Sequence, residues 1–115
     1  MFDVFVFGSN LSGRHGKGAA KVALQHYEAQ YGNGFGLQGK SYAIPTKDER
    51  LQTLPLDRIE NYIRYFIEDA KLHPELRFGI THIGCGLAGY NWERDILPLF
   101  PEVLPSNCIY LKEVD

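Results

Sequence analysis

The chain has 115 residues, a formal net charge of -2 and 44% hydrophobic residues, which is typical of one compact domain and not of a disordered segment. No run of lysine or arginine forms a basic stripe, and no apolar stretch approaches the roughly 18 residues that a membrane span needs, so duplex-binding and membrane-spanning classes are not indicated. The apolar N-terminus is short and has no basic region before it, unlike a secretion signal, and the chain has only two cysteines. We therefore expect a single domain over residues 1–115, in a reducing, cytoplasmic location.

The first half of the chain alternates between apolar and glycine-rich segments. Residues 2–7 are apolar on both faces, which predicts a strand in a sheet that is covered on both sides. A loop rich in Gly, Ser and Asn over 8–18 leads into a predicted helix over 19–32, which a glycine ends. Residues 32–39 contain too many glycines for regular structure to be expected, and 41–46 have the composition of a second strand.

A polar loop at 47–55 precedes the most regular helical pattern in the sequence. From Leu56 onward, apolar residues recur on one helical face, and Pro74 ends the pattern. Asp57 followed by Glu60 predicts a capping box at the start of this helix. The segment therefore predicts a long amphipathic helix that covers one face of the sheet.

The last third of the chain completes an alternating pattern. Residues 76–84 predict a strand, a glycine-rich turn and a short helix near 92–99 follow, and 107–114 predict a final strand. The resulting order is strand, helix, strand, helix, strand, helix, strand. This order predicts an α/β fold with three layers, α/β/α, around a mixed, mostly parallel sheet.

Three predicted loops leave strand ends: 8–18, 47–55 and 84–92. Sheets of this kind bind ligands beyond the carboxyl ends of their strands. Two of the loops are rich in glycine, which permits positive φ and lets backbone N–H groups approach a ligand closely. The first loop also runs into a helix, whose free N–H groups favour a phosphate, although a long flexible connection is the alternative. The loops therefore predict an anion site at this edge of the sheet.

The glycines of the last loop resemble a dinucleotide fingerprint only in spacing. Gly84, Gly86 and Gly89 match G-x-G-x-x-G, but a nicotinamide-binding unit places this motif before a full βαβ unit, and here only a short helix and one strand follow. Gly8 and Gly13 have the outer spacing of a P-loop, but Arg-His stands where Lys-Ser or Lys-Thr is needed. A loop that binds an anion or a ribose phosphate through its backbone fits this context better.

Several reactive side chains have two interpretations each. Cys85 lies three residues after His82, so a thiol nucleophile with a histidine base is conceivable, but the two positions face opposite sides of a strand and a packing role is favoured. Lys47 and Asp48 end the second strand, where either a functional site or a solvated charged turn would place them. The histidines and cysteines lack metal-ligand spacing, so neither a metal site nor a cofactor is expected.

Three segments together resemble the macrodomain family, the ADP-ribose-binding fold. Residues 3–23 are similar to its first signature, a strand that ends in an asparagine, here Asn10, followed by a glycine-rich loop and a helix. Residues 41–47 and 81–100 resemble one branch of the family, with a strand ending in Thr-Lys, a Gly-Cys-Gly loop and a tryptophan, here Trp92, after that loop. That branch contains the terminal ADP-ribose glycohydrolases and the DarG-type DNA ADP-ribosyl glycohydrolase antitoxin.

The resemblance implies ADP-ribose or an ADP-ribosylated substrate as the ligand, held by its diphosphate between the two glycine-rich loops. Asn10 would bind the distal ribose, and Tyr90 would either stack over that ribose or serve in packing. Lys47 would lie near the anomeric carbon as the catalytic residue, as a nucleophile or a proton donor. The implied ligand-binding residues are Asn10, Gly13, Gly16, Gly18, Gly84, Cys85, Gly86, Leu87, Ala88, Gly89 and Tyr90.

Two functions remain open at the level of sequence. One is a hydrolase that removes ADP-ribose from a nucleobase, with DNA as one candidate, or from a protein side chain. The other is a non-catalytic module that binds ADP-ribose or a related nucleotide metabolite. Lys47 favours the enzyme. Ala88 favours the module, because the protein glycohydrolases of the branch have a catalytic aspartate at that position.

Overall fold

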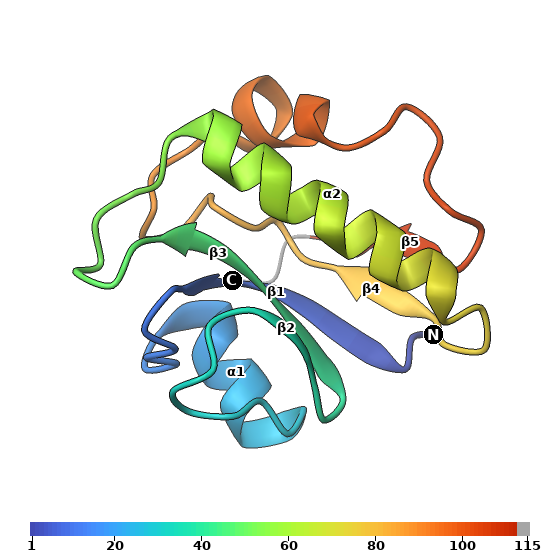
Figure 1. Ribbon diagram of the computed structural model, residues 1–115, viewed down its shortest axis with the longest axis horizontal. Coiled ribbons are helices and arrows are strands. Elements are labelled where there is room, and N and C mark those ends of the chain that lie inside the picture. Colours follow the sequence, from blue (N-terminus) through green and yellow to red (C-terminus); the bar gives the residue numbers. More distant parts are fainter. Residues whose placement is uncertain (113–115) are drawn as a thin grey trace.

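The computed structural model describes residues 1–112, which form a five-stranded sheet with the strand order β2-β3-β1-β4-β5 (Figure 1). Strands β1, β3, β4 and β5 are parallel, and β2 pairs antiparallel with β3 at one edge. The sheet is therefore mixed and mostly parallel, as the sequence predicts. The strands are β1 (Val4–Asn10), β2 (Gly36–Gln38), β3 (Ser41–Lys47), β4 (Phe78–Ile80) and β5 (Cys108–Tyr110).

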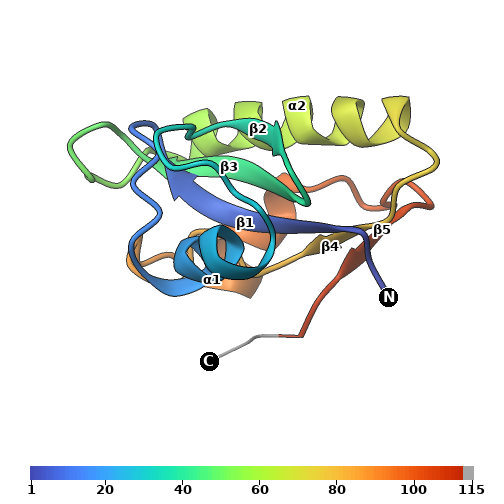
Figure 2. The same ribbon diagram turned by 90° about the horizontal axis from the view of Figure 1, so that it is seen from below.

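Two α-helices cover the two faces of this sheet. Helix α2 (Leu56–Leu72) lies along one face and helix α1 (Gly18–His26) packs on the other, as the view along the sheet in Figure 2 shows. A short π-helical turn, η1 (Trp92–Ile96), runs directly into a 3₁₀ turn, η2 (Leu97–Leu99). The three-layer α/β/α arrangement is thus confirmed. Within residues 1–112, no helix combines the length and apolarity needed to cross a bilayer.

The central strand β1 explains why its sequence is apolar on both faces. Val4 and Val6 belong to the core under α2, whereas Phe5 and Phe7 belong to the core under α1. The core on the α2 side is the larger one and includes buried aliphatic and aromatic residues of the helix itself. The strand therefore anchors both layers, which fixes its carboxyl end between them.

The first glycine-rich segment begins later than the sequence predicts. Strand β1 continues through Gly8 and Ser9 to Asn10, because these residues still pair with the parallel strand β3. Gly8 is also a point of close approach, since a Cβ atom there would lie 3.3 Å from the backbone nitrogen of Gly84. Residues 11–17, which we call the first glycine loop, are what remains between β1 and α1.

The region after α1 departs most from the predicted elements. The helix ends at His26 and not near residue 32, because Tyr27 closes its last turn and Glu28 adopts a left-handed φ of 62°. Strand β2 occupies a segment that was expected to be irregular. A turn through Gly39, with φ of 57°, brings this segment back against β3, so that pairing compensates for its low intrinsic strand preference.

The capping box predicted for α2 is wrong. The helix begins directly after Pro55, so Asp57 lies inside the first turn, where its Oδ1 accepts a hydrogen bond from the Arg58 N–H at 2.9 Å. A carboxylate there still interacts favourably with the helix dipole. Strands β4 and β5 are shorter than predicted, and the end of the predicted strand 107–114 lies outside the described residues.

Candidate functional site

A cavity of about 950 Å³ opens at the carboxyl ends of β1, β3 and β4 and continues along α1. Its volume lies within the range of pockets that bind nucleotide-sized ligands. Nine of the twelve residues predicted for the site line it: Asn10, Gly16, Gly18, Lys47, Gly84, Cys85, Gly86, Leu87 and Ala88. Gly13, Gly89 and Tyr90 are not among the lining residues, although Gly13 precedes the lining residue Arg14 and Gly89 follows the lining residue Ala88. The structure thus brings together three loops that are far apart in the sequence.

The first glycine loop is fastened by the side chain of Asn10. The Asn10 amide oxygen accepts hydrogen bonds from the Arg14 N–H at 2.9 Å and the Ser12 hydroxyl at 2.8 Å, and its Nδ2 donates to the Arg14 carbonyl at 3.0 Å. Asn10 is buried at the cavity wall, with one Nδ2 hydrogen left over from these bonds. The residue expected to contact the distal ribose therefore first shapes the loop that surrounds the ligand.

His15 and Gly13 anchor the same loop from behind. The fully buried His15 ring packs edge-on against Phe7, and its Nε2 lies 3.0 Å from the Asn33 carbonyl oxygen. Gly13 has φ of 71°, and a Cβ atom there would lie 2.3 Å from the Asn33 backbone nitrogen. No side chain fits at that distance, so Gly13 is required for the packing of the loop.

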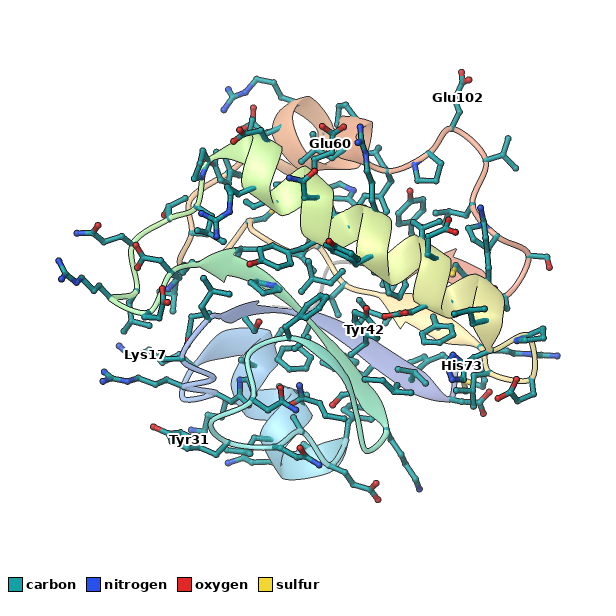
Figure 3. All side chains as sticks on the ribbon, in the orientation of Figure 1. Lys17, Tyr31, Tyr42, Glu60, His73 and Glu102 are labelled. Atoms are coloured by element: carbon teal, nitrogen blue, oxygen red, sulfur yellow. The ribbon has the colours of Figure 1, made fainter. Side chains whose placement is uncertain are left out.

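Gly16 and Gly18, unlike Gly13, have open space around the position of a Cβ atom. Within residues 1–112, nothing lies within 4 Å of a Cβ atom built at either position. They flank Lys17, the N-cap residue of α1, and the first helical turn contains no acidic residue. The N–H groups of a helix start attract anions, so this part of the lining is suited to a phosphate. In Figure 3, Lys17 and Tyr31 mark the α1 side of the cavity, away from α2.

Residues 84–89, the second glycine loop, are held by their own backbone. The Tyr90 N–H donates to the Gly84 carbonyl at 2.8 Å and the Gly89 N–H donates to the Gly86 carbonyl at 3.0 Å. Gly84 and Gly89 have φ of 76° and 86°, values that favour glycine. Gly86 differs, because its Cβ position is open within the described part of the chain. The loop therefore turns through two glycines and presents the third to the cavity.

Tyr90 has two interpretations, stacking over the distal ribose or packing, and its contacts in the structure bear on them. Its hydroxyl donates to the Leu54 carbonyl at 2.7 Å, and its ring packs against the core on the α2 side. Tyr90 therefore joins the second glycine loop to the segment before α2 as a packing residue. The neighbouring His82 ring stacks on Trp92 at a centroid distance of 4.3 Å, and the Cys85 thiol donates to the Ile83 carbonyl at 3.3 Å.

Lys47 ends β3 at the cavity wall, where its carbonyl accepts a hydrogen bond from the Leu11 N–H at 3.0 Å. The carboxylate of Asp48, the next residue, is used for hydrogen bonds within the turn that follows β3. Its Oδ1 accepts hydrogen bonds from the N–H groups of Arg50 and Gln52 at 2.8 and 2.9 Å, which is an Asx-type turn. Lys47 therefore lies beside a carboxylate that the turn itself uses.

The charge of the lining is one-sided. Arg14, Lys17 and Lys47 line the cavity, and none of its lining residues within the described part of the chain is acidic. In a chain with a net charge of -2, this concentration of cations around backbone N–H groups favours an anionic ligand. The described residues contain no group of three histidine, cysteine or acidic side chains that could hold a metal ion.

Sequence reasoning missed two features of the site. Thr53 donates from its hydroxyl to the Ala88 carbonyl at 3.0 Å, which ties the loop after β3 to the second glycine loop. Leu51 lines the cavity with a left-handed φ of 64°. The carboxylate of Asp48, at the start of a polar loop, was the available signal for a turn, but nothing in the sequence indicates which residue of that turn faces the cavity.

Comparisons with known proteins agree with this architecture. No family model and no curated protein matches the sequence. Among solved structures, the macrodomain of Mycobacterium tuberculosis DarG is similar with a TM-score of 0.69 and 18% sequence identity, covering 95% of this chain and 88% of that one. Thermosipho africanus DarTG in complex with ADP-ribose gives a TM-score of 0.63 and 20% identity, covering 96% of this chain but 38% of that longer one. The chain therefore has the macrodomain fold, which confirms the fold that the sequence resemblance implies.

Proposed function

We propose that the cavity binds ADP-ribose and that the protein removes ADP-ribose from a nucleobase or a protein side chain. The observation that carries the proposal is the lining itself: two glycine loops, the start of α1 and three cationic side chains surround one cavity. This arrangement suits a diphosphate with a ribose on either side of it. The similar DarTG structure, which contains ADP-ribose, supports the same ligand.

The orientation of the ligand follows from the two open glycines. Gly16 and Gly86 lie on the two glycine loops and leave room for close approach of a phosphate to backbone N–H groups. The distal ribose then extends toward Lys47, which stands at the end of β3 next to both loops. In hydrolysis, water adds to the anomeric carbon, the bond to the acceptor breaks, and the acceptor atom takes up a proton.

Lys47 is the residue that we propose for the chemistry. The protonated lysine is able to donate the proton to the leaving acceptor. Alternatively, its neutral amine attacks the anomeric carbon as the bond to the acceptor breaks, and water releases the sugar from the lysine in a second step. The alternative function, a binding module without turnover, has specific support: Ala88 brings no carboxylate to the cavity, and Asp48 is used by its own turn.

Calorimetry with ADP-ribose followed by turnover assays separates these functions. The substrates are an oligonucleotide ADP-ribosylated on a base and a peptide ADP-ribosylated on an acidic side chain. Lys47→Ala should lower kcat by about a hundredfold or more, in the range for loss of a positioned acid or base, with a much smaller change in ADP-ribose affinity. Lys47→Arg should not restore turnover, because a guanidinium neither attacks carbon nor releases a proton near neutral pH.

The matched control is Lys40→Ala, which removes an exposed lysine from the turn between β2 and β3. Its kcat should equal that of the unmodified protein. Equal turnover by Lys47→Ala and wild type would place the catalytic group elsewhere. Binding of ADP-ribose without turnover of either substrate would establish the binding module, and no binding at millimolar concentration would remove ADP-ribose as the ligand.

A further inference from the structure

The side of α2 that faces away from the sheet carries a row of exposed residues. Helix α2 is the outermost layer on its side of the molecule (Figure 2), and Arg58, Tyr65 and Leu72 recur along it every seven residues. Glu68 lies between Tyr65 and Leu72. Tyr65 is 61% exposed and Leu72 is 75% exposed, although both are large apolar side chains. Residues at this spacing share one stripe of a helix, which is where a second helix packs.

The row borders an open hollow with aromatic walls. The hollow has a volume of about 530 Å³ and is lined by Arg58, Asn61, Tyr62, Arg64, Tyr65 and Glu68. Phe35, which is 38% exposed, packs against the rings of Tyr62 and Tyr65 at centroid distances of 5.2 and 5.9 Å. Exposed aromatic side chains and arginines gathered around a hollow are typical of a protein–protein contact.

The charges along the row are arranged so that the row complements itself. Arg58 lies near its N-terminal end and Glu68 near its C-terminal end, ten residues or about 15 Å apart along the helix axis. A two-fold axis midway between them brings the Arg58 of each copy opposite the Glu68 of the other. The same axis places Tyr65 of each copy over the hollow of the other, and Leu72 beside the exposed Pro55 at the helix start.

We propose that this outer face of α2 is the contact between two copies of the chain, with their α2 helices antiparallel about a two-fold axis. In such a contact the same patch serves both copies, so it has to be self-complementary, as the row is. Other occupants fit the charges less well. Helix α2 carries four acidic and three basic side chains, so a nucleic-acid backbone or an acidic peptide would meet repelling groups as often as attracting ones.

The charged ends of the row are available to a partner. In the single chain, Glu68 pairs with Lys71 at 3.3 Å, and both side chains are exposed. Exposed pairs of this kind contribute little to stability, so exchange of Lys71 for the Arg58 of a second copy costs little. Helix α2 is about 25 Å long, which places the contact at the lower end of interface areas, and we expect a dimer with a micromolar dissociation constant.

This contact leaves the cavity open. Within residues 1–112, none of the cavity's lining residues comes from α2, and the cavity continues along α1 on the other face of the sheet. The inference therefore does not depend on the proposed function. ADP-ribose should bind equally well to the monomer and to the dimer.

Sedimentation velocity at protein concentrations from about 1 μM to about 500 μM tests the contact over the range in which a micromolar dimer forms. The average mass should rise from 13.1 kDa toward twice that value. Arg58→Glu brings two carboxylates together at each end of the contact, and Glu68→Arg brings two guanidinium groups together. Each variant should therefore dimerise at least about tenfold more weakly than the wild-type protein.

Exchanging the two charges tests the antiparallel register. The double variant Arg58→Glu/Glu68→Arg restores opposite charges at both ends and should dimerise as the wild-type protein does. An equimolar mixture of the two single variants should form a heterodimer, because each supplies the charge that the other needs. Lys21→Glu is the matched control: it reverses an exposed charge on α1, across the sheet from α2, and should leave dimerisation unchanged.

Several results would overturn the inference. A wild-type protein that stays at 13.1 kDa over the whole concentration range has no such dimer. Equal dimerisation of Arg58→Glu and wild type would move the contact to another face, and an equal loss in Lys21→Glu would assign the association to net charge. A double variant that stays monomeric, although its urea midpoint matches that of wild type, would exclude the antiparallel pairing.

The remaining arm of the experiment concerns a different occupant. If the wild-type protein stayed monomeric but bound a single-stranded oligonucleotide, and Arg58→Glu lost that binding, the outer face of α2 would belong to nucleic acid and the dimer would be rejected. Calorimetry with ADP-ribose on the same variants keeps the two proposals apart. Loss of the dimer with unchanged ADP-ribose affinity would leave the proposed function in place, and a dimer that does not bind ADP-ribose would reject that function alone.

Discussion

The two glycine loops differ in how they are held, although both read as glycine-rich connections at strand ends. The first glycine loop is fastened by side chains, through Asn10 at the end of β1 and through the contact of the loop's own His15 with the Asn33 carbonyl. The second is held by backbone bonds inside the loop and by one hydroxyl, Thr53, that reaches its outer side. The first loop is thus fixed to β1 and to the segment around Asn33, whereas the second is fixed mainly through its own backbone and leaves Gly86 and Leu87 exposed.

The glycines fall into two groups with separate physical roles, and this division does not follow the boundary between the two loops. Gly13 and Gly34 are needed because a Cβ atom would collide with backbone, at 2.3 Å and 2.2 Å respectively. Gly16 and Gly86 have open space at the Cβ position within residues 1–112 and leave room for a ligand. Composition alone gives all four the same meaning, so substitutions that separate packing from binding are the way to test the division.

The largest expected effect is on stability, from Gly13→Ala. The added methyl group meets the Asn33 backbone nitrogen at 2.3 Å, and the φ of 71° is unfavourable for alanine, so the turn has to rearrange. We expect a loss of about 3 kcal/mol or more in the free energy of unfolding, measured by urea denaturation. Gly16→Ala is the matched control and should stay within about 1 kcal/mol of wild type. Equal midpoints for the two variants would contradict the assignment of Gly13 to packing.

The next effect separates binding from folding at the open glycines. With ADP-ribose at about 100 times its Kd, the wild-type protein should gain about 2.7 kcal/mol in the free energy of unfolding. Gly86→Val and Gly16→Val should fold normally, because their Cβ positions are open, yet lose this gain because the side chain blocks approach to the backbone. Ser106→Val, in an exposed turn before β5, controls for the added valine. If ADP-ribose raised the free energy of unfolding of Gly86→Val as much as that of the wild-type protein, the second glycine loop would be excluded as a phosphate contact.

A smaller effect is expected from the fastening of the first glycine loop. Asn10→Ala removes three hydrogen bonds that hold Ser12 and Arg14, and should cost about 1–3 kcal/mol in the free energy of unfolding. Hydrogen exchange should then quicken in residues 11–17 more than in the second glycine loop. Asn61→Ala, on the exposed side of α2, is the control. Unchanged exchange in the first loop would show that its shape does not depend on Asn10.

The sequence predicts much of the fold because period and composition are local signals. The alternation of Val4 to Phe7 and the apolar face of α2 both follow from a short stretch of chain. Strand β2 could not be predicted, since it depends on pairing with β3 through a turn at Gly39. The end of α2 has the same character: one Asn107 side chain donates to the carbonyls of three residues at and beyond the helix end, from more than thirty positions away.

The residue types of the candidate site could be expected from the sequence, but the hydrogen-bond and packing partners of its side chains could not. The resemblance implies that the loops and Lys47 share one site, and they line one cavity because strand ends of a parallel sheet converge. It could not show that Asn10 is bonded within its own loop, nor that Tyr90 packs against the segment before α2. The fold brings these partners close to Asn10 and Tyr90. The sequence around a residue does not indicate which distant residue it will contact in the tertiary structure.

The smallest effect concerns the reactivity of the two thiols. It compares Cys108, which is buried in the core, with Cys85 at the cavity wall, and the labelling needs no substitution. Burial raises the pKa of the Cys108 thiol to about 11, so at pH 8 it is almost entirely protonated and should react very slowly with iodoacetamide. Cys85 is half-buried at the cavity wall and should be alkylated first, as mass spectrometry of labelled peptides will show. ADP-ribose should slow the labelling of Cys85 and leave Cys108 unaffected. Because folding raises the pKa of Cys108 above its ordinary value near 9.0, its contribution to stability is complete below pH 9 and declines as the pH rises toward 11. Cys108→Ser, which cannot ionise in this range, should lose less stability than wild type between these two pH values. Faster labelling of Cys108 than of Cys85 in the folded protein would mean that β5 opens more readily than the second glycine loop, and would reverse the comparison between core and cavity wall.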